Sequence, residues 1–160
     1  MTATPALDDA GQQTVNEILA AHRGMEGALL PILHAVQDAF GFVPPEALPI
    51  IAEDLNISRA EAHGVMTFYH DFREKPAGRH VLKLCRAEAC KAMGADTLAT
   101  HVREKLGADW HETTSDGAIT LEPVFCLGLC ACAPAAMTDG KLVGRADVAK
   151  LDAFIEGARA

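Results

Sequence analysis

The chain has little of what membrane, secreted and nucleic-acid-binding proteins need. No stretch approaches the roughly 18 consecutive apolar residues of a membrane span, and the N-terminus has neither the basic nor the apolar region of a secretory signal. Positive charge is scarce, since 14 Lys and Arg stand against 22 Asp and Glu for a net charge of −8. Such a chain gains no affinity for phosphate backbones from counterion release. We therefore expect a soluble, cytoplasmic protein that binds neither membrane nor nucleic acid.

Several chemical motifs are missing as well. No G-x-G-x-x-G and no G-x-x-x-x-G-K-S/T loop is present, so we do not expect this chain to bind nicotinamide or nucleotide through those loops. The five cysteines are an odd number, which fits a closed disulfide framework poorly. In a reducing cytoplasm they are better explained as metal ligands, catalytic thiols or core residues. None of them forms the C-x-x-C of a thiol–disulfide exchanger.

What is present is ordinary globular composition, with 49% hydrophobic and 22% charged residues over 160 positions. A chain of this length can bury a core without disulfide or metal support. We expect a flexible tail over 1–13, a helical domain over 14–72 and a second domain over 79–160. A polar, turn-rich stretch over 71–78 separates the two domains.

The first half is predicted to be helical throughout. The clearest helix runs from Leu29 to Phe40, where apolar residues recur at the spacing of one helix face, and Gly41 ends it. A capping box at Ser58 and Glu61 starts a later helix, because each side chain can satisfy the other residue's free backbone amide. Short helices with brief connections indicate a small helical bundle.

Beyond residue 78, strands alternate with helices. The strand at 81–84 precedes a helix that Gly107 ends. Turn residues 115–117 and the Asp139-Gly140 dipeptide each join two strand-like runs as hairpins. A last helix follows, and this order suggests a thin, thioredoxin-like sandwich.

The chemistry-bearing residues are two spaced pairs of cysteines. Cys85 and Cys90 begin where the strand at 81–84 ends, and Cys126 and Cys130 begin where the strand at 118–125 ends. In one thioredoxin-like sheet both strand ends can meet at the same edge, which would bring four thiolates together. Gly128 suits a loop whose backbone bends tightly and whose amides approach sulfur.

The spacing leaves more than one metal open. C-x4-C with C-x3-C lies at the wide end of the spacings used by structural zinc sites. A [2Fe–2S] centre also takes four thiolates, and C-x4-C occurs in plant-type ferredoxins. No C-x2-C follows Cys90, however, so the chain does not have the plant-type pattern.

The pattern Cys85-x4-Cys90 … Cys126-Leu-Gly-x-Cys130-x-x-Ala133-Pro134 resembles the thioredoxin-like [2Fe–2S] ferredoxins, in particular the small iron–sulfur subunit of bacterial NADH:quinone oxidoreductase. The stretches 30–44 and 64–69 also resemble that family, and the likeness covers roughly 14–158. Segments 63–72 and 86–94 look most like the gamma subunit of the molybdenum-containing, NAD-dependent formate dehydrogenase.

The resemblance implies an α+β chain in which a small helical bundle precedes a thioredoxin-like domain carrying one [2Fe–2S] cluster. It implies four ligands: Cys85, Cys90, Cys126 and Cys130. Cys132 departs from the family pattern, and a spare thiol so close to a ligand could exchange with Cys130. Arg86 and Lys91 adjoin the ligands and could offset the cluster's negative charge, or could be solvated loop residues.

The function implied is single-electron transfer, with no catalytic residue in this chain. The partners implied are a diaphorase subunit that holds FMN and binds NAD and, through the complex, a molybdenum-containing subunit that oxidises formate. One alternative is the equivalent subunit of NADH:quinone oxidoreductase or of an NAD-linked hydrogenase. Others are a zinc-stabilised interaction module without a redox role, and an assembly scaffold that uses its helical surface.

Overall fold

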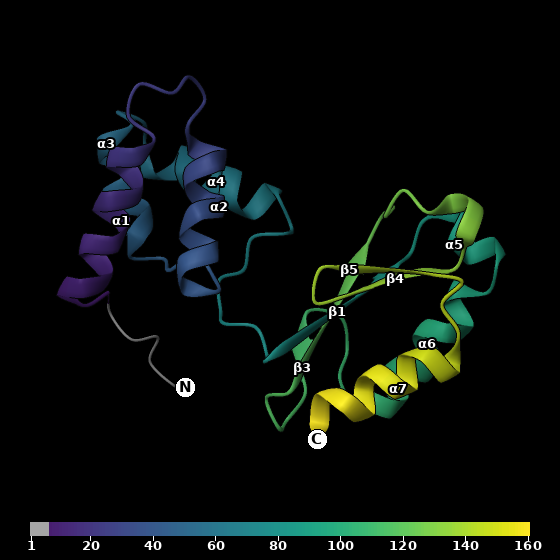
Figure 1. Cartoon of the computed structure of the whole chain (residues 1–160). Helices are drawn as coiled ribbons and strands as arrows, with labels where there is room; N and C mark the ends of the chain where they lie inside the picture. Colours follow the sequence, from purple (N-terminus) through teal and green to yellow (C-terminus); the bar gives the residue numbers. More distant parts are fainter. Residues whose placement is uncertain (1–6) are drawn as a thin grey trace. The chain divides into compact units, whose positions relative to one another are not determined.

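The computed structural model describes residues 7–160, and the contacts within it divide the chain into two units, 1–76 and 77–160 (Figure 1). Within the described residues, no helix is long and apolar enough to cross a membrane.

Four helices form the first unit: α1 (Asp9–Ala21), α2 (Leu29–Phe40), α3 (Ala47–Asp54) and α4 (Arg59–Phe68). Their apolar faces pack into one core around the fully buried Leu33, Val36 and Ile51. The predicted bounds of α2 are confirmed, and Gly41 ends the helix in a left-handed conformation, with φ +79°. The capping box of α4 is also present, with Ser58 and Glu61 bonded in both directions.

The predicted tail is wrong over its last five residues. Helix α1 begins at Asp9, because the Asp8 carboxylate accepts a hydrogen bond from the Gly11 backbone N–H at 2.8 Å and caps the helix. The prediction began the helix only at Thr14, where apolar periodicity starts, and overlooked this cap. Residues 1–6 of the predicted tail lie outside the described residues.

A buried polar side chain fixes the end of the first unit. The Gln37 amide donates to the carbonyl of Asp71 at 2.8 Å and accepts from the backbone N–H of Arg73 at 2.7 Å. Gln37 is buried despite its polarity because both ends of its amide are satisfied. Helix α2 therefore holds the chain segment that leaves the helical unit.

A five-stranded mixed sheet with the order β2-β3-β1-β4-β5 organises the second unit. The strands are β1 (His80–Cys85), β2 (Glu112–Thr113), β3 (Ile119–Val124), β4 (Ala135–Thr138) and β5 (Lys141–Gly144). Both predicted hairpins are present as antiparallel pairs, β2 with β3 and β4 with β5. The Asp139-Gly140 turn has positive φ at both residues, +47° and +78°, as a two-residue hairpin turn requires.

Helices α6 (Ala95–Leu106) and α7 (Val148–Arg159) lie side by side and share a core with the sheet (Figure 1). Leu82, Ile119 and Leu151 are fully buried between these helices and the strands. The short helix α5 (Glu88–Ala92) and the 3-10 turn η1 (Cys130–Cys132) were not predicted. Both lie in the cysteine-bearing loops.

The pairing of β1 with β3 places the two cysteine loops at one edge of the sheet. The strands run parallel and in register, with Cys85 opposite Val124. Chain segments that leave parallel strands at the same level emerge side by side. The predicted juxtaposition of the two strand ends is therefore confirmed.

Candidate metal centre

The first cysteine pair is enclosed by apolar residues. Cys85 and Cys90 are each only 2% exposed and pack with Ala95 and Ala135 in a small cluster of their own. Cys85 ends β1, and Cys90 lies in α5, whose single turn returns the chain towards the strand. The half-buried Leu127 and Leu129 of the second loop pack against the same cluster. The two loops therefore share one apolar base.

The second pair lies at the surface. Cys126 and Cys130 are exposed residues, and their Sγ atoms lie 3.8 Å apart. Two thiolates bound to one tetrahedral metal at about 2.3 Å would have their sulfurs about 3.8 Å apart. This spacing therefore fits a pair that shares one metal ion.

The loop that carries the second pair bends through unusual backbone conformations. Cys126 has φ +107°, which a residue with a side chain rarely adopts, and Gly128 has φ +77°. As a result the Gly128 backbone N–H points back at the Cys126 Sγ, at 3.3 Å. The expectation that Gly128 lets an amide approach sulfur is confirmed. The positive φ of Cys126 has no signal in the sequence.

The two loops meet at the Cys85 thiol. Burial is the largest influence and opposes its ionisation, but backbone N–H groups of Ala87, Leu127 and Cys126 and the Cys90 thiol hydrogen-bond to it. Their combined effect holds the pKa of Cys85 below its usual value. Two of these amides belong to the opposite loop, so the site is built to favour a thiolate at this position.

The pKa values of the other two shifted thiols, Cys90 and Cys130, are raised. Burial, followed by the hydrogen bond to Cys85, raises the pKa of Cys90, although the Ala135 amide acts against this. The hydrogen bond and the charge of Cys126 raise the pKa of Cys130, and Cys85 adds to the effect. Thiols that lie close enough to raise a neighbour's pKa repel one another as anions unless a cation lies among them. That arrangement is typical of a metal centre.

The donor set fits a [2Fe–2S] cluster. In residues 7–160, no three His, Cys, Asp or Glu side chains lie close enough together to hold a single ion. A [2Fe–2S] cluster takes four thiolates, one pair per iron, and two such pairs meet here. Backbone N–H groups directed at sulfur are among the features that set the properties of these clusters.

Cys132 lies in the same 3-10 turn as Cys130. Its Cβ lies beside Gly144 at the end of β5.

The basic residues near the ligands have partners of their own. The Arg86 guanidinium pairs with Asp96 at 2.8 Å and stacks on Trp110, with its carbon 5.0 Å from the ring centroid. The Lys91 ammonium lies 3.9 Å from Glu88, one turn away in α5. A neighbouring carboxylate therefore partly offsets each positive charge. Sequence reasoning did not predict that Arg86 would link its loop to Asp96 and Trp110.

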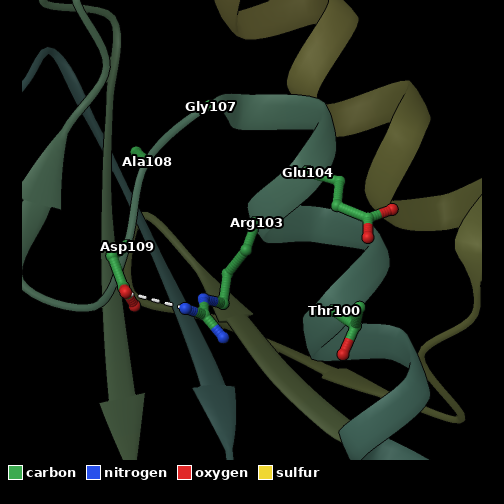
Figure 2. A pocket seen from close by; sticks show the side chains of 6 residues that line it. All are labelled: Thr100, Arg103, Glu104, Gly107, Ala108 and Asp109. Carbon is green, nitrogen blue, oxygen red and sulfur yellow. Dashed lines mark hydrogen bonds and ion pairs between the residues drawn. The ribbon is translucent and has the colours of Figure 1, made fainter.

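The surface also has a shallow hollow at the end of α6, which contains none of the cysteines (Figure 2). An ion pair of 2.7 Å between Arg103 and Asp109 spans it. The backbone N–H of Trp110, with help from Arg103, holds the pKa of Asp109 below its usual range. Because Arg103 and Asp109 pair with each other, the hollow does not compete with the cysteine loops as a site of chemistry.

Fold and site together define an iron–sulfur electron carrier built on a thioredoxin-like sheet. The chain belongs to the thioredoxin-like [2Fe-2S] ferredoxin family, whose model matches residues 15–159. Members of this family carry a [2Fe–2S] cluster. The predicted fold class and cofactor are thereby confirmed.

Two curated relatives illustrate the family. A subunit of the NADH-quinone oxidoreductase of Rhizobium meliloti (strain 1021) is 35% identical over 149 residues, which are 93% of this chain and 89% of the relative. The NADP-reducing hydrogenase subunit HndA of Solidesulfovibrio fructosivorans is 34% identical over 119 residues, covering 74% of this chain and 70% of that relative.

A solved structure shares the fold. The crystal structure of an NAD+-reducing [NiFe]-hydrogenase in the air-oxidized state superposes with a TM-score of 0.70 and 26% sequence identity. The match covers 82% of this chain but only 23% of that chain. The present chain thus corresponds to about a quarter of that hydrogenase chain.

Proposed function

We propose that the chain is a single-electron carrier in which Cys85, Cys90, Cys126 and Cys130 hold one [2Fe–2S] cluster and residues 79–160 form the electron-transfer domain. The observation that carries this proposal is the meeting of a buried and an exposed thiol pair at one edge of the sheet. When bound, the cluster accepts and releases one electron at a time.

The chain's own residues shape the environment of that cluster. Backbone N–H groups of both loops donate to the sulfur of Cys85, which stabilises its thiolate form. The Gly128 N–H donates to the sulfur of Cys126. The apolar base under Cys85 and Cys90 keeps water from that side. The exposed Cys126 and Cys130 offer a short path to a redox partner at the surface.

We also propose that the chain acts as a subunit beside a partner that holds FMN and binds NAD. The names of the relatives support this, since they are subunits of an NADH-quinone oxidoreductase and an NADP-reducing hydrogenase. In finer detail, we propose the NAD-dependent formate dehydrogenase, in which a molybdenum-containing subunit supplies the electrons. The resemblance of segment 86–94 to the gamma subunit of that enzyme supports this choice.

Two measurements test the proposal. The purified chain should contain about two irons and two acid-labile sulfides and give a rhombic electron paramagnetic resonance (EPR) signal only after reduction. Stoichiometric zinc without such a signal would refute it. Purification from its native source should then recover an FMN-containing subunit.

The electron donor separates the finer possibilities. Reduction of NAD+ by formate in the recovered complex supports formate dehydrogenase, whereas reduction by hydrogen, or quinone reduction by NADH, assigns the chain to one of the alternatives. The isolated chain should reduce no artificial acceptor with NADH, because its sequence contains neither of the glycine-rich nucleotide-binding loops.

A further inference from the structure

The turn that presents Cys130 rests on a glycine of the neighbouring strand. A Cβ placed on Gly144 would come within 3.0 Å of the Cβ of Cys132 and 3.9 Å of the Leu129 side chain. The first distance is shorter than contacts between side-chain carbons allow without a shift. Leu129 and Cys132 lie on either side of Cys130, so a Cβ at residue 144 would push the turn away from β5 by a few tenths of an ångström.

Backbone hydrogen bonds hold the same turn in place. The N–H of Cys132 donates to the Leu129 carbonyl at 2.8 Å and closes the 3-10 turn. The Cys132 carbonyl in turn accepts from the N–H of Arg145 at 2.6 Å, directly after Gly144. The N–H of Ala146 donates to Pro134 at 2.8 Å. The two residues after β5 therefore hydrogen-bond to the backbone at Cys132 and Pro134, at the end of the turn.

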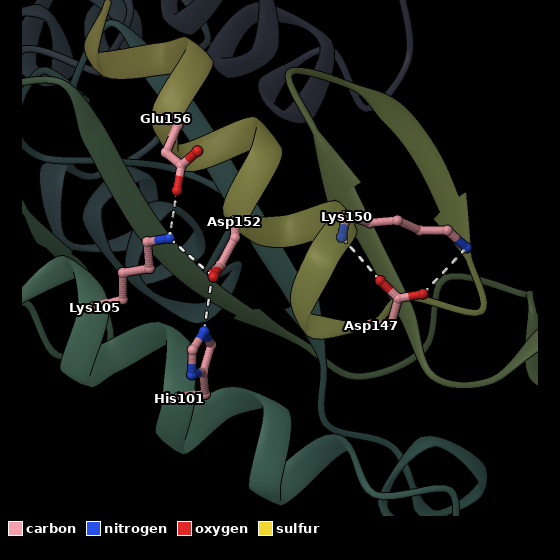
Figure 3. Close-up of polar contacts among 6 residues, drawn as sticks. All are labelled: His101, Lys105, Asp147, Lys150, Asp152 and Glu156. Atoms are coloured by element: carbon pink, nitrogen blue, oxygen red, sulfur yellow. Dashed lines mark hydrogen bonds and ion pairs between the residues drawn. The ribbon is translucent and has the colours of Figure 1, made fainter.

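Helix α7 stabilises that segment from its N-terminus. The Lys150 ammonium donates to the carbonyl of Arg145 at 2.7 Å and to that of Gly144 at 3.4 Å. Asp147 caps the helix by accepting from the Lys150 backbone N–H at 2.8 Å, and its carboxylate also faces the Lys150 ammonium (Figure 3). A continuous set of contacts thus runs from α7 through residues 144–146 to the turn at Cys130.

We propose that Gly144 is a positioning residue for Cys130, and that Cys132 serves as its packing partner and not as a metal ligand. The inference rests on the proposed function, in which Cys130 binds the cluster. The strand end, held by Lys150, fixes the turn from behind, while the sulfur of Cys130 remains on the exposed side facing Cys126. The contact that matters is made by the Cβ of Cys132, which explains how a fifth cysteine can lie two residues from a ligand without binding metal.

The principal test is Gly144→Ala in the cluster-containing chain, with Gly157→Ala as its matched control. Nothing lies within 4 Å of a Cβ at Gly157, in α7, so the control makes the same chemical change in open space. Gly144→Ala should change the EPR line shape of the reduced cluster and speed its loss to an iron chelator several-fold. Gly157→Ala should match the wild type in both. Wild-type line shape and loss rate in Gly144→Ala would overturn the proposal.

A rescue experiment distinguishes the contact from a general loss of stability. Adding Cys132→Gly to Gly144→Ala removes the opposing Cβ and should restore the line shape and slow the loss of the cluster. Cys132→Ala alone keeps the Cβ and should behave as wild type. If the double variant loses its cluster as fast as Gly144→Ala, or if Cys132→Ala loses iron, the proposal is wrong.

Should Gly144→Ala fail to fold, Lys150→Met tests the same path. It removes both hydrogen bonds to residues 144 and 145 and should alter the line shape in a folded protein. Lys105→Met is its control, since it breaks pairs between α6 and α7 at 2.9 Å with Asp152 and Glu156 (Figure 3). It should lower the melting temperature but leave the line shape unchanged. An unchanged line shape in Lys150→Met overturns the positioning role. Wild-type protein without a [2Fe–2S] signal would instead refute the underlying function.

Discussion

The two cysteine loops present their thiol pairs in opposite environments, one buried and one exposed. Cys85 and Cys90 are buried on an apolar base, and Cys85 receives amides from both loops. Cys126 and Cys130 are exposed. Cys126 has a positive φ, and Cys130 begins a 3-10 turn that packs against the end of β5. The difference suggests a division of labour, in which the buried pair secures the cluster and the exposed pair admits the redox partner.

The largest expected effect is the loss of the cluster when the buried pair is altered. Cys85→Ser replaces a soft thiolate by a harder oxygen donor, in a pocket that also leaves the hydroxyl poorly solvated. We expect no retained iron or acid-labile sulfide, as measured by colorimetric assay of the purified protein. Cys132→Ser is the matched control and should retain both. A stable, red-brown Cys85→Ser protein would contradict the division between the pairs.

A smaller effect is expected from the same substitution in the exposed pair. Cys130→Ser should keep part of its cluster with a shifted visible spectrum, because the exposed position leaves the hydroxyl solvated and able to act as an oxygen ligand. Absorption and EPR spectroscopy measure the shift. A Cys130→Ser spectrum identical to that of wild type would mean that Cys132 has replaced it, against the geometry described above.

The rate at which each thiol is alkylated compares the buried and exposed pairs without any mutation. After iron is removed by a chelator, an alkylating reagent should label Cys126 and Cys130 first. Labelling of Cys85 and Cys90 requires local opening, and each 1.4 kcal/mol or so of opening free energy slows it about tenfold. Peptide mass spectrometry over time gives the order. Equal rates at all four thiols would show that the enclosure of the first pair depends on the cluster.

The smallest expected effect is on the acid dependence of stability, and it should leave the two cysteine loops alike. Asp152 bonds His101 and then Lys105 across α6 and α7, and these two bonds hold its pKa below the usual value (Figure 3). The unfolded chain therefore binds more protons in acid, so this contribution to stability is present above the ordinary Asp pKa of about 3.9 and is lost as the pH falls towards the folded value.

Asp152→Asn should flatten that dependence. Its melting temperature should fall less than that of wild type between about pH 5 and pH 3, as followed by far-ultraviolet circular dichroism. The relative labelling of the two thiol pairs should stay as in wild type at neutral pH. A steeper loss in Asp152→Asn would assign the acid sensitivity to another group.

Much of the fold could be predicted because local signals agreed with the tertiary structure. The apolar spacing of α2, the capping box at Ser58 and the Asp139-Gly140 turn each specify a local conformation that packing then preserves. Helix α1 was predicted to start too late because its cap at Asp8 precedes the apolar pattern. Gln37 was missed because a polar residue beside an apolar face gives no sign of a distant backbone partner.

The candidate site was also predicted only where local sequence patterns determine it. The cysteine spacing, together with the family resemblance, predicted the four thiols, and the strand ends predicted where they meet. The amides that cross from one loop to the sulfur of the other, the positive φ of Cys126 and the contact of Cys132 with Gly144 could not be predicted. They depend on how two segments far apart in sequence approach each other, which no short pattern encodes.

The parallel register of β1 and β3 has a consequence for variation in chain length. The positions of Cys85 and Cys126 are tied to each other through the paired strands, and not through the many residues that separate them along the chain. Insertions at the exposed turn 115–117, between β2 and β3, can therefore lengthen the connection without moving either cysteine. A single-residue deletion inside β3 is different, since it would shift the register and turn alternate side chains to the opposite face. We therefore expect the centre to tolerate an insertion between its two cysteine pairs better than a change in the strand that aligns them.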